Sequence, residues 1–93
     1  MTVQIRRSPA RYKAYLEGER VGDLAYSRDG DVVTAHHTEV ADEAEGQGVG
    51  SELARSLLDD ARAEGWRVDA QCPFVSGWID RHPEYADLRV SAN

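Results

Sequence analysis

Three glycines at alternate positions, Gly46, Gly48 and Gly50, stand directly before a helical pattern that contains Ser51 and Leu53. A glycine-rich turn that opens a helix leaves several backbone N–H groups unpaired at the positive end of the helix dipole, and this arrangement binds phosphate. A flexible connection with a glycine entry to the helix explains the same residues equally well. The surrounding sequence has to distinguish the two interpretations.

The two common nucleotide-binding loops do not fit this glycine pattern. A nucleoside-triphosphatase loop needs a lysine immediately after its glycines, and the only lysine of the chain is Lys13. A dinucleotide-binding loop follows the first strand of a larger doubly wound sheet. This chain has 93 residues, and the strands predicted before the loop are joined by hairpins. Neither nucleotide loop is therefore expected.

Three side chains outside the loop suit proton or acyl transfer. Imidazole is a base that works near neutral pH, so His37 could collect a proton, and the Glu39 carboxylate could do the same. In a regular strand, His36 would lie on the face opposite His37. Cys72 precedes Pro73 at a predicted helix N-terminus, where the dipole stabilises a thiolate that accepts an acyl group, or a thiol that protonates a leaving group.

Each of these three residues also has an ordinary interpretation. A strand histidine often bonds to a neighbouring carbonyl, a carboxylate at a strand end is often solvated, and a free cysteine is often a small buried apolar residue. Metal binding is not expected, because His37 and Cys72 are only two ligands.

The residue pattern predicts the elements that position these groups. Hairpin signals at Glu17-Gly18-Glu19 and Asp29-Gly30 separate predicted strands over residues 3–6, 12–17, 20–27 and 31–40. An apolar helical face predicts a helix that Gly65 ends, and its members are Leu53, Ala54, Leu57, Leu58 and Ala61. Residues 66–70 alternate as a strand, and a second short helix begins at Pro73 and ends before Pro83.

This order predicts an α/β (α+β) fold. An antiparallel meander is followed by a helix that starts at the glycines, a parallel strand and a short C-terminal helix. The crossover should be right-handed, with the helix N-terminus at the carboxyl end of the preceding strand. Ligands bind at that end of open sheets.

Length and charge narrow the class of protein. Residues 1–93 are expected to form a single domain. The net charge of −6, from 17 acidic and 11 basic residues, argues against nucleic acid or an anionic membrane as the main partner. One cysteine excludes an internal disulfide, and neither a membrane-spanning run nor a signal peptide is visible, so a cytoplasmic location is expected. The sequence leaves monomer and dimer open.

The loop and its neighbours together resemble the GCN5-related N-acetyltransferases. The similarity is to the very small, single-domain acetyltransferase-like proteins of that superfamily, and it covers roughly residues 12–88. The segments that carry it are His37-Thr38-Glu39-Val40, Gly46-Gln47-Gly48-Val49-Gly50, Cys72-Pro73-Phe74-Val75 and Arg81-His82-Pro83-Glu84-Tyr85.

This resemblance implies a truncated fold of that superfamily that binds acetyl-CoA. The pantetheine arm would run beside the strand that ends at Val40, and the pyrophosphate would lie over Gly46, Gln47, Gly48, Val49, Gly50 and Ser51. The implied reaction is direct attack of an amine on the thioester, with Cys72, His37 and Glu39 near the reacting groups. Whether Cys72 is nucleophile, acid or structural stays open.

Glu45 departs from the superfamily pattern, which has Arg or Gln at this position. A carboxylate beside a pyrophosphate is repulsive, so its side chain turns away or the affinity falls. Arg81 or His82 at the end of the second helix either meets a phosphate or is simply solvated.

The acceptor side is expected to be open. Larger members carry helices between their first two strands, whereas the predicted connections here are hairpins. An open acidic surface suits a lysine side chain or another cationic amine. The alternative function is a coenzyme A-binding module or protein-interaction domain without transferase activity.

Overall fold

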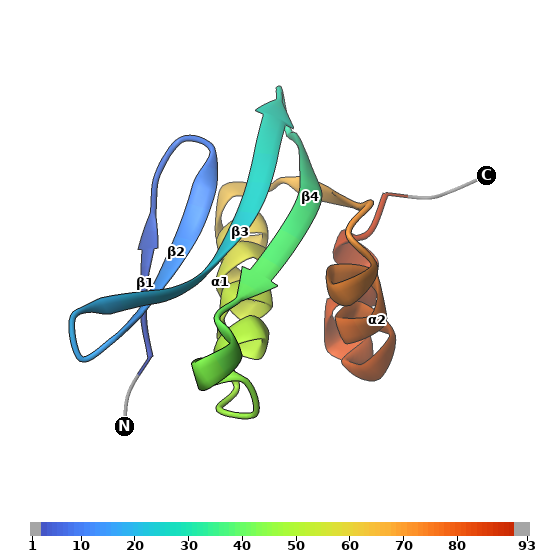
Figure 1. The fold of residues 1–93 in the computed structure, drawn as a ribbon. Coiled ribbons are helices and arrows are strands. Elements are labelled where there is room, and N and C mark those ends of the chain that lie inside the picture. The colour runs from blue at the N-terminus through green and yellow to red at the C-terminus, as the bar shows by residue number, and fades with distance from the viewer. Residues whose placement is uncertain (1–2, 91–93) are drawn as a thin grey trace.

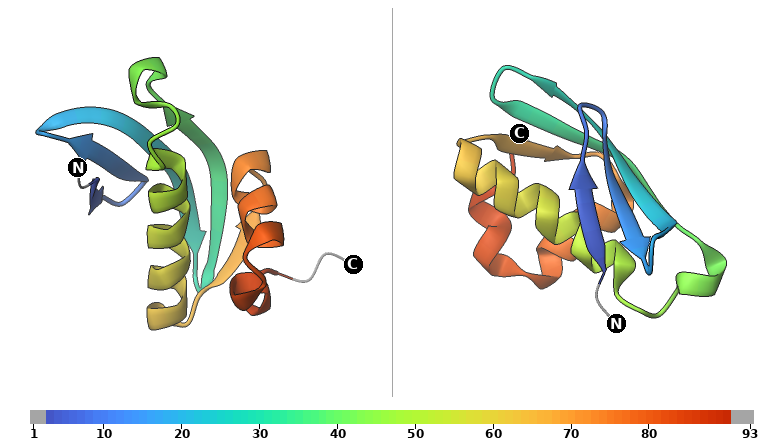
Figure 2. Two further views of the ribbon diagram at one scale, coloured as in Figure 1. Left: turned by 90° about the horizontal axis from the view of Figure 1, so that it is seen from below. Right: turned by 90° about the vertical axis from the view of Figure 1, so that its left-hand side faces the viewer.

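The computed structural model describes residues 3–90, which form a five-stranded sheet with two helices against one face (Figures 1 and 2). The strands lie in chain order and are β1 (Gln4–Arg7), β2 (Arg11–Leu16), β3 (Glu19–Asp29), β4 (Val32–Val40) and β5 (Arg67–Ala70). All neighbours pair antiparallel except β4 and β5, which are parallel. The helices are α1 (Val49–Glu64) and α2 (Pro73–Arg81), with 3-10 turns η1 (Asp42–Ala44) and η2 (Pro83–Leu88).

The mixed α/β fold confirms the prediction from the sequence, and the ends of the predicted strands differ by only one or two residues. The two 3-10 turns were not predicted. Pro83 does end α2, but it also begins η2, in which the Tyr85 N–H bonds to the His82 carbonyl at 2.9 Å. Proline suits the first position of a helical turn because it needs no N–H partner there.

The apolar face of α1 packs on the middle of the sheet. Its buried members are those that the helical spacing predicted, together with Val49. Gly22 on β3 lets the first turn of α1 approach closely, since a Cβ there would lie 2.9 Å from the Glu39 carbonyl oxygen and 3.1 Å from a Val49 methyl group. The start of α1 is therefore held against the ends of β3 and β4.

Tyr12 connects β2 to the far part of α1. Its buried ring packs against Tyr26, and its hydroxyl donates a hydrogen bond to Asp60 at 2.7 Å. Burial and the neighbouring carboxylate raise the pKa of Tyr12 well above its ordinary value. The phenol is therefore neutral and holds α1 on the sheet.

Trp78 fixes α2 beside the first turn of α1. The ring is only 1% exposed, it stacks on His82 with centroids 3.7 Å apart, and its indole N–H donates to the Ser51 hydroxyl oxygen at 2.8 Å. As a result, α2 and the beginning of α1 form one wall on the helix-covered side of the sheet.

Candidate functional site

The glycine loop ends in a set of outward-facing N–H groups. Gly46 and Gly48 have φ values of +83° and +81°, a conformation that favours glycine, and Gly48 is the N-cap of α1. The first hydrogen bond of α1 runs from the Glu52 N–H to the Gly48 carbonyl at 3.0 Å. The N–H groups of residues 49–51 precede it and have no acceptor within the helix. This is the geometry of an anion-binding helix start.

A cavity of about 530 Å³ lies over this helix start and is called the loop cavity here. Its walls come from the end of β4, the loop and one side of α2. The lining residues are Thr38, Val40, Ala44, Glu45, Gly46, Gly48, Val49, Gly50, Ser51, Phe74 and Arg81.

Phe74 lies across the first turn of α1 at this cavity. A Cβ on Gly50 would come within 2.7 Å of the ring, so glycine is what allows the ring to lie there. The side chain is nevertheless 39% exposed, and it is the one exposed large apolar side chain within residues 3–90. It provides an apolar surface beside the N–H groups.

Strands β4 and β5 separate before β4 ends. Their pairing stops at Ala35 and Ala70, and the Cys72 N–H then bonds to the Ala35 carbonyl at 2.9 Å. Within residues 3–90, the part of β4 from 36 to 40 has no strand partner on that side. An extended amide-bearing ligand can pair with such a free strand edge.

A β-bulge at His36 determines which side chains of β4 face each side. His37 lies opposite Ala25 whereas Ala35 lies opposite Tyr26, so His36 is an extra residue. Opposed residues share a face. Thr38, opposite the fully buried Leu24, therefore lies on the helix side, whereas His37 lies on the open side.

The expected regular alternation of His36 and His37 is thus wrong. In a regular strand, His37 and Glu39 would share the face of Ala35; the bulge shifts the alternation by one residue. Both histidines are exposed, and His36 contacts the Ser27 hydroxyl at 2.8 Å through Nε2.

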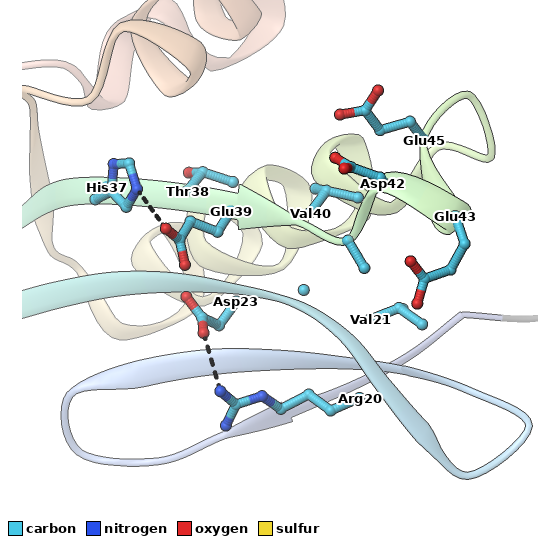
Figure 3. A pocket seen from close by; sticks show the side chains of 12 residues that line it. Arg20, Val21, Asp23, His37, Thr38, Glu39, Val40, Asp42, Glu43 and Glu45 are labelled. Carbon is cyan, nitrogen blue, oxygen red and sulfur yellow. Dashed lines mark hydrogen bonds and ion pairs between the residues drawn. The ribbon is translucent and has the colours of Figure 1, made fainter.

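The open face carries a second cavity, of about 670 Å³, called the open-face cavity here (Figure 3). His37 Nε2 lies 3.3 Å from Glu39 Oε2, and both side chains are well exposed. Asp23 is nearly buried and pairs with Arg20 at 3.4 Å and Arg11 at 3.3 Å. The lining residues are Arg20, Val21, Gly22, Asp23, His37, Thr38, Glu39, Val40, Ala41, Asp42, Glu43 and Glu45.

Thr38, Val40 and Glu45 line both cavities. Thr38 is the only one of these three with a hydroxyl side chain. Its Oγ1 lies 3.3 Å from Cys72 Sγ, within hydrogen-bonding distance for sulfur. The helix-side hydroxyl of this shared residue is therefore in contact with the buried thiol.

The structure brings most of the predicted site residues to the two cavities. Val40, Gly46, Gly48, Val49, Gly50 and Ser51 line the loop cavity, and His37 and Glu39 line the other. Gln47 is absent from both linings, and its amide lies 3.5 Å from the Glu43 carbonyl.

Cys72 lines neither of these cavities. Its side chain is 2% exposed and it is the N-cap of α2. Its Sγ contacts the Thr38 hydroxyl, and Thr38 lines both cavities.

The sequence pattern indicated no separate role for Thr38 or for Phe74. Thr38 stands between His37 and Glu39, but only the bulge places its side chain on the helix side of β4. Phe74 follows Cys72-Pro73, and its exposure was not predictable from helical spacing.

Residues 3–90 contain neither a metal-binding cluster nor a membrane-spanning helix. No three His, Cys, Asp or Glu side chains in residues 3–90 come together as a metal site. None of the helices in that range is long and apolar enough to cross a membrane.

Solved structures share this fold. A GCN5-like protein from Staphylococcus aureus, solved by NMR, matches with a TM-score of 0.75 at 24% identity over 97% of this chain and 90% of the other. The Escherichia coli ribosomal-protein-S18-alanine N-acetyltransferase matches with a TM-score of 0.63 at 16% identity, over 70% of this chain and 43% of that enzyme. An acetyltransferase from Elizabethkingia anophelis with acetyl-CoA bound gives 0.60 at 18%, over 81% and 51%.

These likenesses, all below 25% identity, establish the fold. A comparison with curated proteins found no match. The family is established separately, because the family model described as GCN5-related N-acetyl-transferase matches residues 11–88, which is most of the chain. This chain therefore belongs to the GCN5-related N-acetyltransferase family.

Proposed function

We propose that this protein transfers the acetyl group of acetyl-CoA to a cationic amine at the junction of the two cavities. The observation that carries the proposal is that an anion-binding helix start and an acidic, open cavity lie next to each other along the end of β4, where Thr38 and Val40 line both. A donor in the loop cavity and an acceptor in the open-face cavity would reach each other there.

The loop cavity fits coenzyme A in both its polar and apolar parts. The N–H groups of residues 49–51 would hold the pyrophosphate, with Gly46 and Gly48 keeping the approach free of side chains. The Ser51 oxygen accepts from Trp78, which leaves the Ser51 O–H free to donate to a phosphate. The free edge of β4 from 36 to 40 would pair with the pantetheine amides. Acetyl-CoA supplies the activated acyl group as a thioester.

His37 and Glu39 are the proposed proton acceptors. An amine attacks a thioester only in its unprotonated form, and a neutral imidazole can take the proton directly or through one water molecule. Glu39, 3.3 Å away, stabilises the imidazolium that results. Both side chains are exposed to the cavity, so an acceptor can reach them.

Thr38 is the proposed donor to the departing sulfur. Its side chain lies on the helix side of β4, in the lining of the loop cavity, and a hydroxyl can donate to charge that develops on an oxygen or sulfur. Cys72 holds the Thr38 hydroxyl in place from below, at 3.3 Å. In this arrangement Cys72 is a positioning residue and receives no acetyl group.

The acceptor is proposed to be positively charged. The open-face cavity is lined by five carboxylates and by only two basic side chains, Arg20 and His37. Arg20 is already paired with Asp23. The remaining acidic residues are Glu39, Asp42, Glu43 and Glu45. A net negative, open surface attracts extended cationic groups such as a lysine side chain.

The release of free coenzyme A from acetyl-CoA tests this proposal. A lysine-containing peptide is expected to support release, and the same peptide with glutamine in place of lysine is not. His37→Gln should lower kcat by about a hundredfold, the usual size of a general-base contribution, and Glu39→Gln by less. His36→Gln is the matched control, because His36 lines neither cavity, and its kcat should equal the wild-type value.

Wild-type turnover by His37→Gln would show that the base is elsewhere. Acetyl-CoA binding without release for any cationic amine would favour a coenzyme A-binding module over an enzyme. Equal release of coenzyme A with neutral and cationic amines would refute only the proposal that the acceptor is positively charged.

A further inference from the structure

Arg81 is the cation of the loop cavity. Among the described residues that line this cavity, it is the single basic side chain, and Glu45 is the single acidic one. The anion-binding loop therefore has a negative charge at its first position and a positive charge across from it, on a different element.

The Arg81 guanidinium lies along α2 toward the start of that helix. Its Nη1 would be 3.4 Å from a Cβ at Gly77, one turn back, so the side chain runs back along α2 while the residue stays exposed. The neighbouring Asp80 is taken up by Arg89 at 3.0 Å. Within residues 3–90, no carboxylate forms an ion pair with Arg81.

The helix that carries Arg81 is rigidly joined to the phosphate loop. Trp78 on α2 donates to Ser51 in the first turn of α1, and Phe74 rests on Gly50 in the same turn. The part of α2 from which Arg81 extends is consequently held at a fixed place relative to the N–H groups of residues 49–51. An arginine on a fixed element is well suited to bidentate contact with a phosphate.

We propose that Arg81 binds the pyrophosphate of coenzyme A from the α2 side. It supplies a positive charge that the loop itself lacks, since Glu45 stands where the superfamily has Arg or Gln. This inference rests on the proposed function, since it assumes that coenzyme A occupies the loop cavity. Arg81 shares one cavity with the loop N–H groups, so the phosphates nearest those groups are the ones in its reach. The 3′-phosphate of the nucleotide is the competing target.

Isothermal titration with coenzyme A and with dephospho-coenzyme A, which lacks the 3′-phosphate, separates these targets. Arg81→Gln is expected to lower the affinity for both ligands to the same degree, by about tenfold. This is the size expected for the loss of one charge-assisted hydrogen bond at an exposed site. The dependence of Kd on salt should also become shallower, because one ionic contact is lost. Arg6→Gln, on β1 at the far edge of the sheet, removes the same charge and should change neither ligand.

A second variant tests whether a positive charge at position 45 can replace the one at position 81. Glu45→Arg in the Arg81→Gln background restores a cation to the same cavity and should recover most of the lost affinity. Circular dichroism of each variant confirms that the fold is kept.

The possible results are distinguishable. Unchanged affinity and salt dependence in Arg81→Gln overturn the inference while wild-type binding still supports the proposed function. A loss for coenzyme A but not for dephospho-coenzyme A assigns Arg81 to the 3′-phosphate and overturns the pyrophosphate assignment. Absence of wild-type binding overturns both the inference and the proposed function.

Discussion

Replacing Ser51 by aspartate is expected to weaken acetyl-CoA binding at least a hundredfold without destabilising the protein. Residue 51 is in the first turn of α1, where a carboxylate interacts favourably with the helix dipole by about 0.3–1 kcal/mol. An aspartate oxygen can also accept the Trp78 indole N–H that Ser51 now accepts at 2.8 Å. The new charge, however, occupies the place proposed for the pyrophosphate.

The expected loss of affinity follows from simple electrostatics. Two like charges about 4 Å apart near a protein surface repel by about 4 kcal/mol, and screening reduces this, so at least a hundredfold weaker binding is expected. Calorimetric titration with acetyl-CoA measures it, and thermal unfolding without ligand measures the stability.

Ser51→Asn is the matched control, since it has nearly the same shape as aspartate and can accept from Trp78 without carrying a charge. It should keep most of the affinity. Equal affinity of Ser51→Asp and wild type would place the phosphates elsewhere, and equal loss in both variants would point to shape and not to charge.

Replacing Trp78 by alanine is expected to have the largest effect on stability. The ring is 1% exposed, and removing a buried Trp side chain costs about 3–5 kcal/mol. A domain of 93 residues has a total unfolding free energy of only about 5–14 kcal/mol. Urea denaturation followed by far-UV circular dichroism measures the loss, since Trp78→Ala removes one of the two tryptophans on which a fluorescence signal would depend.

Trp78→Phe separates packing from the hydrogen bond to Ser51. It keeps an aromatic ring against His82 and Tyr85 but removes the N–H donor, and should cost about 1–2 kcal/mol. Both variants should also bind acetyl-CoA less tightly, because α2 carries Phe74 and Arg81 in the cavity wall. Unchanged unfolding free energy in Trp78→Ala would contradict the docking of α2 described here.

The sequence was sufficient to predict the five strands, the two α-helices and their order. Turn signals at Glu17-Gly18 and Asp29-Gly30 are local, and the apolar face of α1 repeats at a single period. These features depend on residues close together in the chain, which explains why they are readable without a structure. The phosphate loop is similarly local, since Gly46 and Gly48 are adjacent to the helix that they open.

The faces of β4 were not predictable, because they depend on how β4 pairs with β3. The bulge at His36 exists only in the register between the two strands, and it moves Thr38 to the helix side. The place of Cys72 was hidden for a similar reason. Its burial beneath Thr38 results from α2 packing at the end of β5, which joins parts of the chain 34 residues apart.

The partners of side chains on α2 also had to come from the structure. The helix-end position of Arg81 left two interpretations open from sequence, a phosphate contact and a solvated helix end. Arg81 lines the same cavity as Glu45 and the loop N–H groups, which favours the phosphate contact. This placement depends on how α2 packs against α1, which the sequence does not show.

The most direct test of the account is amide chemical-shift mapping of the ¹⁵N-labelled protein during titration with acetyl-CoA. The account predicts saturable shifts that are largest for the backbone N–H groups of residues 46–51, followed by residues 36–40 of β4 and by Phe74 and Arg81 on α2. The amide signals of β1, at the opposite edge of the sheet, should not shift. Saturating acetyl-CoA that leaves the amides of residues 46–51 unshifted would contradict the central claim that this helix start binds the acetyl donor.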